Sequence, residues 1–170
     1  MDAARERSLQ RLVTSLEELT KLYRQLHDLV AAERELLLGA RLEELALSNE
    51  TKDGLLLKIR LADAARLKAA EEMAAHVGAD AANPRLLAIA ELLGTEGNRL
   101  RGLHATLETL LTRVSEMNKG NEEHARTALR TLNGAMNDIK ETLSGKKTYE
   151  RKGHYKLGPE TTGNFVRKEA

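Results

Sequence analysis

Five histidines, the residues best suited to metal binding and to proton transfer near neutral pH, are scattered along the 170-residue chain. None has a glutamate three residues before it, so the Glu-x-x-His pairs of di-iron helical bundles are absent. His104 and Glu108 would share one turn of a helix, but an isolated pair of this kind is usually solvated. The sequence therefore predicts no metal site and no catalytic histidine.

Other reactive side chains also lack the pattern that chemistry would need. Gly94 and Gly97 flank a polar segment that has neither the lysine nor the spacing of a phosphate-binding loop. Adjacent glutamates, such as Glu17 and Glu18, are typical of solvated helix faces. The chain has no cysteine, which excludes disulfides, thiolate catalysis and cysteine-based zinc sites. We therefore expect no enzymatic activity, no catalytic residues and no cofactor.

The aromatic residues are concentrated near the C-terminus. Three of the four, Tyr149, Tyr155 and Phe165, lie in the segment 144–170, which carries seven Lys and Arg residues against three Glu residues. This segment has several glycines and no periodicity, so we expect a flexible basic tail. Cations beside aromatic rings could contact single-stranded nucleic acid. Seven cations are few, however, so ordering on a protein partner is the favoured hypothesis and we expect no nucleic-acid binding.

The preceding part of the chain begins with two segments of helical periodicity. A heptad pattern of apolar residues starts at Leu9 and is interrupted once, at Glu33. Such a pattern predicts a long helix that packs against other helices. Gly39 favours a short turn that reverses the chain. We therefore expect two long antiparallel helices, at about 3–38 and 42–77.

Two further helices are expected after the second long one. Asn83 suits the capping position, and Pro84 the first position, of a short helix at about 84–93. A polar break then precedes a last long helix at about 98–143. The predicted fold class is all-α: an elongated antiparallel helical bundle or coiled coil of three long helices plus one short helix. It forms one helical domain, 1–143, before the tail.

The last long helix carries an apolar face that lacks an evident partner. After a slip in the heptad register near residues 118–123, a new stripe begins, and it consists of Leu129, Leu132, Met136, Ile139 and Leu143. No equally long helix remains to cover this stripe once the first two helices are paired. Ordinary core and an exposed docking groove for another helix both stay open as interpretations, and a second copy of the chain could also cover it.

Short motifs along the chain add a resemblance to a known family. They are Leu29-Val30-Ala31-Ala32-Glu33-Arg34-Glu35, Leu36-Leu37-Leu38-Gly39 with Leu42, Glu50-Thr51-Lys52 before Leu55-Leu56, Ile89-Ala90-Glu91-Leu92-Leu93, Met117-Asn118-Lys119-Gly120-Asn121, Thr148-Tyr149 with Gly153, and Phe165-Val166-Arg167-Lys168-Glu169-Ala170. In this order they resemble the FlgN family of flagellar type III export chaperones. The resemblance spans nearly the whole chain.

This resemblance implies a specific function and specific partners. Such a chaperone binds the C-terminal amphipathic helices of the flagellar hook-filament junction (hook-associated) proteins, prevents their premature assembly and delivers them to the flagellar type III export gate. The residues from Leu129 to Leu143 would then bind the substrate protein. A tail tyrosine would dock on the cytoplasmic domain of the export gate, with Tyr149 at the matching position and Tyr155 as second choice.

The alternative interpretation is a homo-oligomeric coiled-coil scaffold without a secreted client. A weak homodimer is compatible with the chaperone as well. The N-terminal residues lack an apolar run behind basic residues, and no apolar stretch approaches the length of a spanning helix. We therefore expect a cytoplasmic protein without stable membrane insertion.

Overall fold

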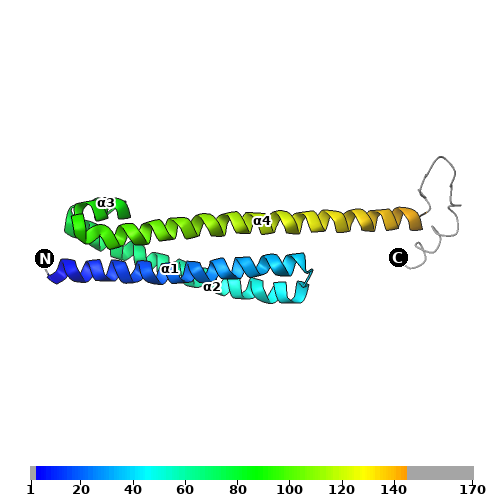
Figure 1. Cartoon of the computed structure of the whole chain (residues 1–170), viewed down its shortest axis with the longest axis horizontal. Coiled ribbons are helices and arrows are strands. Elements are labelled where there is room, and N and C mark those ends of the chain that lie inside the picture. Colours follow the sequence, from blue (N-terminus) through cyan, green and yellow to red (C-terminus); the bar gives the residue numbers. More distant parts are fainter. Residues whose placement is uncertain (1–2, 145–170) are drawn as a thin grey trace. The chain divides into compact units, whose positions relative to one another are not determined.

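The computed structural model describes residues 3–144. This part of the chain contains the α-helices α1 (Ala3–Leu38), α2 (Leu42–Val77), α3 (Leu86–Leu92) and α4 (Asn98–Leu143), with a 3-10 helix, η1 (Gly94–Gly97), before α4 (Figure 1). No strand occurs among the described residues. The all-α class is therefore confirmed. The predicted tail lies outside the described residues except for Ser144, and its flexibility stays a prediction.

The chain divides into two compact units inside α4, between Asn121 and Glu122. The first unit holds residues 1–121 and the second holds residues 122–170. The division falls where the heptad register slips in the sequence. The boundary predicted at residue 143, between the helical domain and the tail, stays a prediction.

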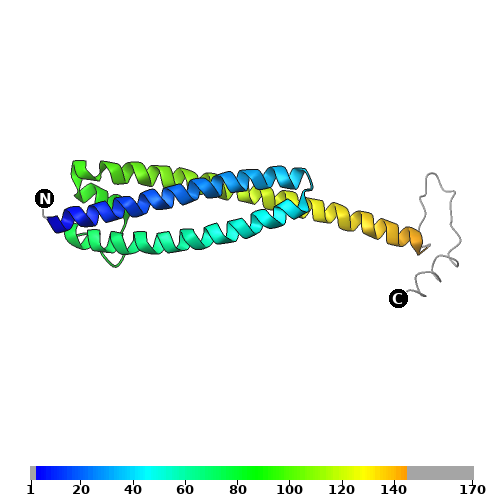
Figure 2. The ribbon, with the colours of Figure 1, turned by 90° about the horizontal axis from the view of Figure 1, so that it is seen from below.

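In the first unit, α1 and α2 form an antiparallel hairpin, and the first part of α4 lies beside it (Figures 1 and 2). Arg99 of α4 pairs with Glu17 of α1, and farther along the side-chain amide of Asn121 donates to the carbonyl of Val30 at 2.9 Å. The residue numbers of the contacting pairs increase along both helices, so this part of α4 runs parallel to α1. It is therefore antiparallel to α2, and the three helices form an up-down-up bundle.

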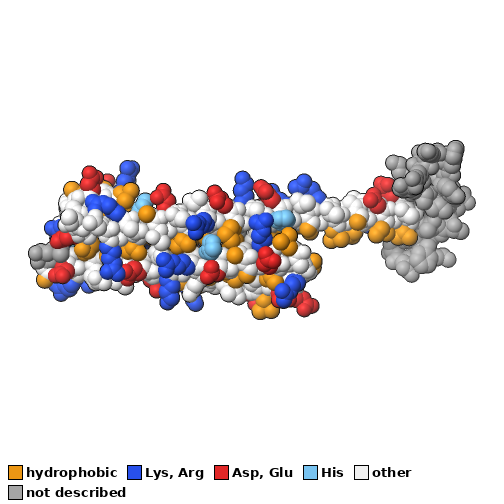
Figure 3. Space-filling view, viewed as in Figure 1, with side chains coloured by type: hydrophobic (Ala, Val, Ile, Leu, Met, Phe, Trp, Pro, Cys, Tyr) orange, Lys and Arg blue, Asp and Glu red, His pale blue; other side chains and the backbone are white. Residues whose placement is uncertain are grey.

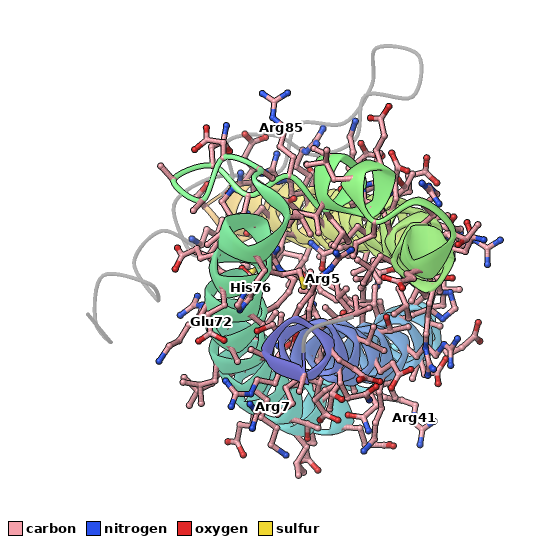
Figure 4. All side chains as sticks on the ribbon, turned by 90° about the vertical axis from the view of Figure 1, so that its left-hand side faces the viewer. Arg5, Arg7, Arg41, Glu72, His76 and Arg85 are labelled. Carbon is pink, nitrogen blue, oxygen red and sulfur yellow. The ribbon has the colours of Figure 1, made fainter. Side chains whose placement is uncertain are left out.

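The core of this bundle is aliphatic, as the heptad pattern predicts. Its largest fully buried side chains are Leu12, Leu16, Val30, Met73, Ile89 and Leu100. The second half of α2 contributes buried alanines, and short side chains let α1 and α2 approach closely. Seen along the helices, side chains converge between them, and Arg5 lies there close to the bundle end (Figure 4). Its guanidinium contacts Glu96 of η1 at 3.5 Å.

The turn between α1 and α2 forms where a glycine predicted it, but the left-handed residue is Ala40, with φ 51°. The amide of Gly39 still continues the helix and donates to the carbonyl of Glu35 at 3.0 Å. At the other end of α2, Gly78 adopts the left-handed conformation, with φ 76°, and its amide donates to the carbonyl of Ala74. Glycine is favoured there because it has no Cβ to strain.

The prediction for the short helix was wrong at its start. Asn83 does not cap it, because α3 begins at Leu86 after Arg85 in an extended conformation. The Oδ1 atom of Asp80 instead accepts the backbone amides of Ala82 at 2.9 Å and Asn83 at 3.3 Å. Residues 80–83 therefore form a turn of their own, and the helix starts at Leu86, two residues after the proline.

The backbones of α3 and η1 lie very close together just before α4 begins. A Cβ atom on Gly97 would lie 2.1 Å from the carbonyl oxygen of Ala90, so only glycine fits. The guanidinium of Arg101 donates to the carbonyls of Ala90 at 2.8 Å and Gly94 at 3.0 Å. These bonds satisfy one carbonyl of α3 and one of η1, and they tie both to Arg101 of α4.

Candidate functional site

The stripe predicted on the last helix is exposed along one face of the second half of α4. Its exposed fractions range from 46% at Met136 to 59% at Leu129. Steps of three and four residues keep all five side chains on one face of a helix. Figure 3 shows these apolar side chains as a row along one edge of this segment. The five residues, Leu129, Leu132, Met136, Ile139 and Leu143, are called the α4 stripe below.

The burial pattern of α4 explains why the α4 stripe is uncovered. The buried residues of this helix are Leu100, Leu107, Val114 and Asn121, at a strict seven-residue spacing. None of the residues 122–143 is buried, and only Ala125 among them is half-buried. The seven-residue series of buried side chains in α4 therefore ends at Asn121, the last residue of the first unit.

A polar layer closes this apolar contact, and it consists of Glu33, Lys52, Asn118 and Asn121. The ammonium of Lys52 lies 2.8 Å from Oε2 of Glu33 and also donates to Oδ1 of Asn118 at 3.0 Å. Glu33 is buried, although charged residues rarely are unless they are paired. The sequence marked Glu33 only as an interruption of the heptads. The heptad pattern of one helix cannot identify the partner of Glu33, because Lys52 lies on another helix.

The polar face of the same α4 segment is satisfied by its own backbone. The hydroxyl of Thr127 donates to the carbonyl of Glu123 at 2.9 Å, and that of Thr131 donates to the carbonyl of Thr127 at 3.1 Å. Glu122 and Arg126 form an ion pair one turn apart. These polar side chains are therefore satisfied within the segment itself, whereas the apolar side chains of the α4 stripe have no cover.

The ionisable groups of residues 3–144 include a histidine–glutamate pair and a tyrosine with a raised pKa. His104 and Glu108 lie with Nδ1 and Oε2 3.8 Å apart on the surface of α4. Among residues 3–144 no group of three His, Asp or Glu side chains could hold a metal ion. Burial raises the pKa of Tyr23 above its ordinary value, and the negative charge of Asp63 adds to this effect. The Tyr23 side chain is therefore neutral at physiological pH.

A hollow of about 970 Å³ also opens between α1, α2, α3 and α4 in the first unit. Leu16, Leu19 and Tyr23 contribute to it from α1, and Leu87 and Leu111 lie half-exposed at it. Sequence reasoning missed this hollow, because it depends on where the short α3 lies against the long helices. Its walls are mainly apolar, and two pairs of oppositely ionisable side chains also line it: Asp63 with Arg66 and His104 with Glu108.

The two candidate docking tyrosines, Tyr149 and Tyr155, lie outside the described residues, so their role stays a prediction. Within residues 3–144, no helix combines the length and the apolar character that crossing a membrane requires.

Comparison with known proteins supports the resemblance seen in the sequence. The sequence profile of the family described as FlgN protein matches residues 1–156, a range that includes α1 to α4. No curated protein and no solved structure matches the chain significantly. FlgN is a family of chaperones and is not known as a family of enzymes. The chain therefore belongs to the FlgN family, the flagellar export chaperone family.

Proposed function

We propose that this FlgN-family chaperone binds the C-terminal amphipathic helices of flagellar hook-associated junction proteins through its α4 stripe. The carrying observation is the exposure of all five stripe side chains on a helix segment with no buried residue. An apolar helix face of this kind fits the apolar face of a second helix, with anchors at helical spacing. The stripe from Leu129 to Leu143 is roughly 21 Å long at about 1.5 Å per residue.

The energetics favour a client that is itself amphipathic. Covering a half-exposed side chain of leucine size contributes roughly 1 kcal/mol, so five such contacts can offset part of the cost of association. Met136 lies at the centre of the stripe, and its flexible side chain adapts to partners of different shape. Both partners would shield apolar surface that otherwise promotes aggregation.

The proposal places this binding in the cytoplasm, before export. A client helix held on α4 could not polymerise early, and delivery to the export gate would then release it. Tyr149, or as second choice Tyr155, would dock on the cytoplasmic domain of the gate. Neither holding nor delivery requires hydrolysis by the chaperone.

Co-purification of the full chain with C-terminal segments of hook-associated proteins tests the binding step. The double variant Leu132→Asp/Ile139→Asp should abolish co-purification and leave helicity unchanged, because both side chains are exposed. The matched control is Thr127→Asp/Thr131→Asp, which adds the same charge to the opposite face of the same segment. Equal binding by both double variants and the unmodified chain would refute the α4 stripe as the client site.

Sedimentation of the free chain and of the mixture separates this proposal from the scaffold alternative. A monomer or weak dimer that forms a one-to-one complex with a junction protein supports the chaperone. A stable oligomer that ignores such clients would instead support a coiled-coil scaffold.

A further inference from the structure

A second exposed apolar row lies on the outer face of α2, away from the core. Leu47 and Leu61 are each 66% exposed and Leu57 is 58% exposed, whereas Leu55 and Ile59 on the inner face are buried. α2 is therefore apolar on two sides. A helix that is apolar on more than one side usually packs against more than one neighbour.

The exposed residues of this face follow a heptad pattern. One row consists of Leu47, Gly54 and Leu61, and the adjacent row consists of Glu50, Leu57 and Ala64. Two such rows, three and four residues apart, are the seam by which one helix packs along another. The first unit leaves this seam without a helix, because all six residues are exposed.

Gly54 has no evident role in the fold of the single chain. A Cβ atom added to it would have no heavy atom within 4 Å, and the residue lies inside a helix, where glycine is less favourable than alanine. Together with Leu29 and Leu55 it lines a hollow of about 360 Å³. A bare backbone beside a hollow in the middle of an apolar row provides a hole for a side chain from outside.

The seam is complementary to itself in the antiparallel orientation. If two copies of α2 pack antiparallel with Gly54 opposite Leu57 of the partner subunit, Leu47 lies opposite Ala64 of the partner subunit. Large residues then meet small ones at both positions. The same register brings Asp53 beside Arg60 of the partner subunit, and the two-fold symmetry makes this pair twice. Asp53 and Arg60 are exposed and form no ion pair within the described part of the chain.

We propose that two copies of this chain associate through the outer faces of their α2 helices, antiparallel and in this register. An interface formed by one helix from each copy buries less surface than a standard interface, which buries roughly 800 Å² per partner. Glu50 also lies opposite the partner's Leu61, which places a carboxylate in the seam. Both features make the dimer dissociable, so it exchanges with monomer at micromolar concentrations. The surface is separate from the α4 stripe, and the inference does not rest on the proposed client binding.

A charge-exchange cycle in the full chain tests the register. Asp53→Arg and Arg60→Asp should each raise the dimer dissociation constant about tenfold, because each places like charges opposite each other twice. The double variant Asp53→Arg/Arg60→Asp should return the constant to within about threefold of the original. Glu50→Ala should tighten the dimer, because it removes the carboxylate from the seam. Sedimentation equilibrium over a range of concentrations measures each constant.

Two controls complete the test. Leu132→Asp/Ile139→Asp should leave dimerisation unchanged, and Leu57→Asp should weaken it at least tenfold while client binding persists. A chain that stays monomeric at every concentration would overturn the proposal. So would a dimer that ignores the charge exchange, or one that is lost when the α4 stripe is altered.

Discussion

Lys52 on α2 and Glu33 on α1 form an ion pair in the interior of the three-helix bundle, with 2.8 Å between Nζ and Oε2. Only 6% of the Glu33 side chain and 20% of the Lys52 side chain are exposed. Asn118 of α4 joins the same ammonium, so all three long helices meet at this pair. A buried charge whose counter-charge lies on another helix favours the one register of the bundle in which the two side chains meet.

The polar layer predicts an asymmetric response to substitution. Glu33→Ala should lower the free energy of unfolding by about 2–4 kcal/mol, because it leaves a largely buried ammonium without its counter-charge. The double variant Glu33→Leu/Lys52→Met should be less destabilised than Glu33→Ala, because no unpaired charge remains. Urea unfolding followed by circular dichroism measures both. A double variant as unstable as the single one would show that the pair is not the cause.

Leucines of the bundle and of the α4 stripe should differ sharply in their effect on stability. Leu16 is fully buried, so Leu16→Ala should cost about 3 kcal/mol of unfolding free energy. Leu132 is 56% exposed, so Leu132→Ala should change the same quantity by less than about 0.5 kcal/mol. Urea titrations of the two variants under identical conditions provide the comparison. A large loss for Leu132→Ala would mean that the α4 stripe belongs to the core.

Two glycines near the start of α4 should respond in opposite directions to alanine. Gly97→Ala should destabilise the bundle by about 2 kcal/mol or more, because the new methyl group would collide with the backbone of Ala90. Gly102→Ala meets no atom within 4 Å and should stabilise α4 by about 0.5–1 kcal/mol. The shift in thermal midpoint measures both effects. Two shifts of the same sign would contradict the close approach between α3 and η1.

The tyrosines of the C-terminal segment should affect export and not client affinity. Tyr149→Ala should lower secretion of the hook-associated proteins while their affinity for the chaperone stays nearly unchanged, since the α4 stripe is intact. Tyr155→Ala provides the comparison for the second candidate. Secreted protein in culture supernatants and co-purified client from the same cells separate the two steps. Normal secretion by the Tyr149 variant would remove it from the docking step.

Much of the fold could be predicted from the sequence. Apolar periodicity predicts the helices, and local signals such as glycine predict where they end. Gly39 and Gly78 mark the ends of the first two long helices, and α4 begins after the polar break at Asn98, as expected. The capping role of Asn83 failed because α3 begins only at Leu86, after Arg85 in an extended conformation. Asp80 forms a turn before the proline, and it accepts the backbone amides of Ala82 and Asn83. The hollow beside α3 could not be predicted, because it depends on contacts between elements that are distant in the sequence.

The amino-acid sequence alone determined that this protein consists of long aliphatic helices, since heptad spacing defines an apolar face whatever lies beside it. It also carried the resemblance to the FlgN family. The tertiary structure decided which of these faces are covered. Glu33, read as a break in the pattern, is buried because Lys52 reaches it from α2, whereas the leucines of the α4 stripe and of the outer α2 face stay exposed. Burial depends on whether another helix lies alongside, and only the packed arrangement of all the helices determines that.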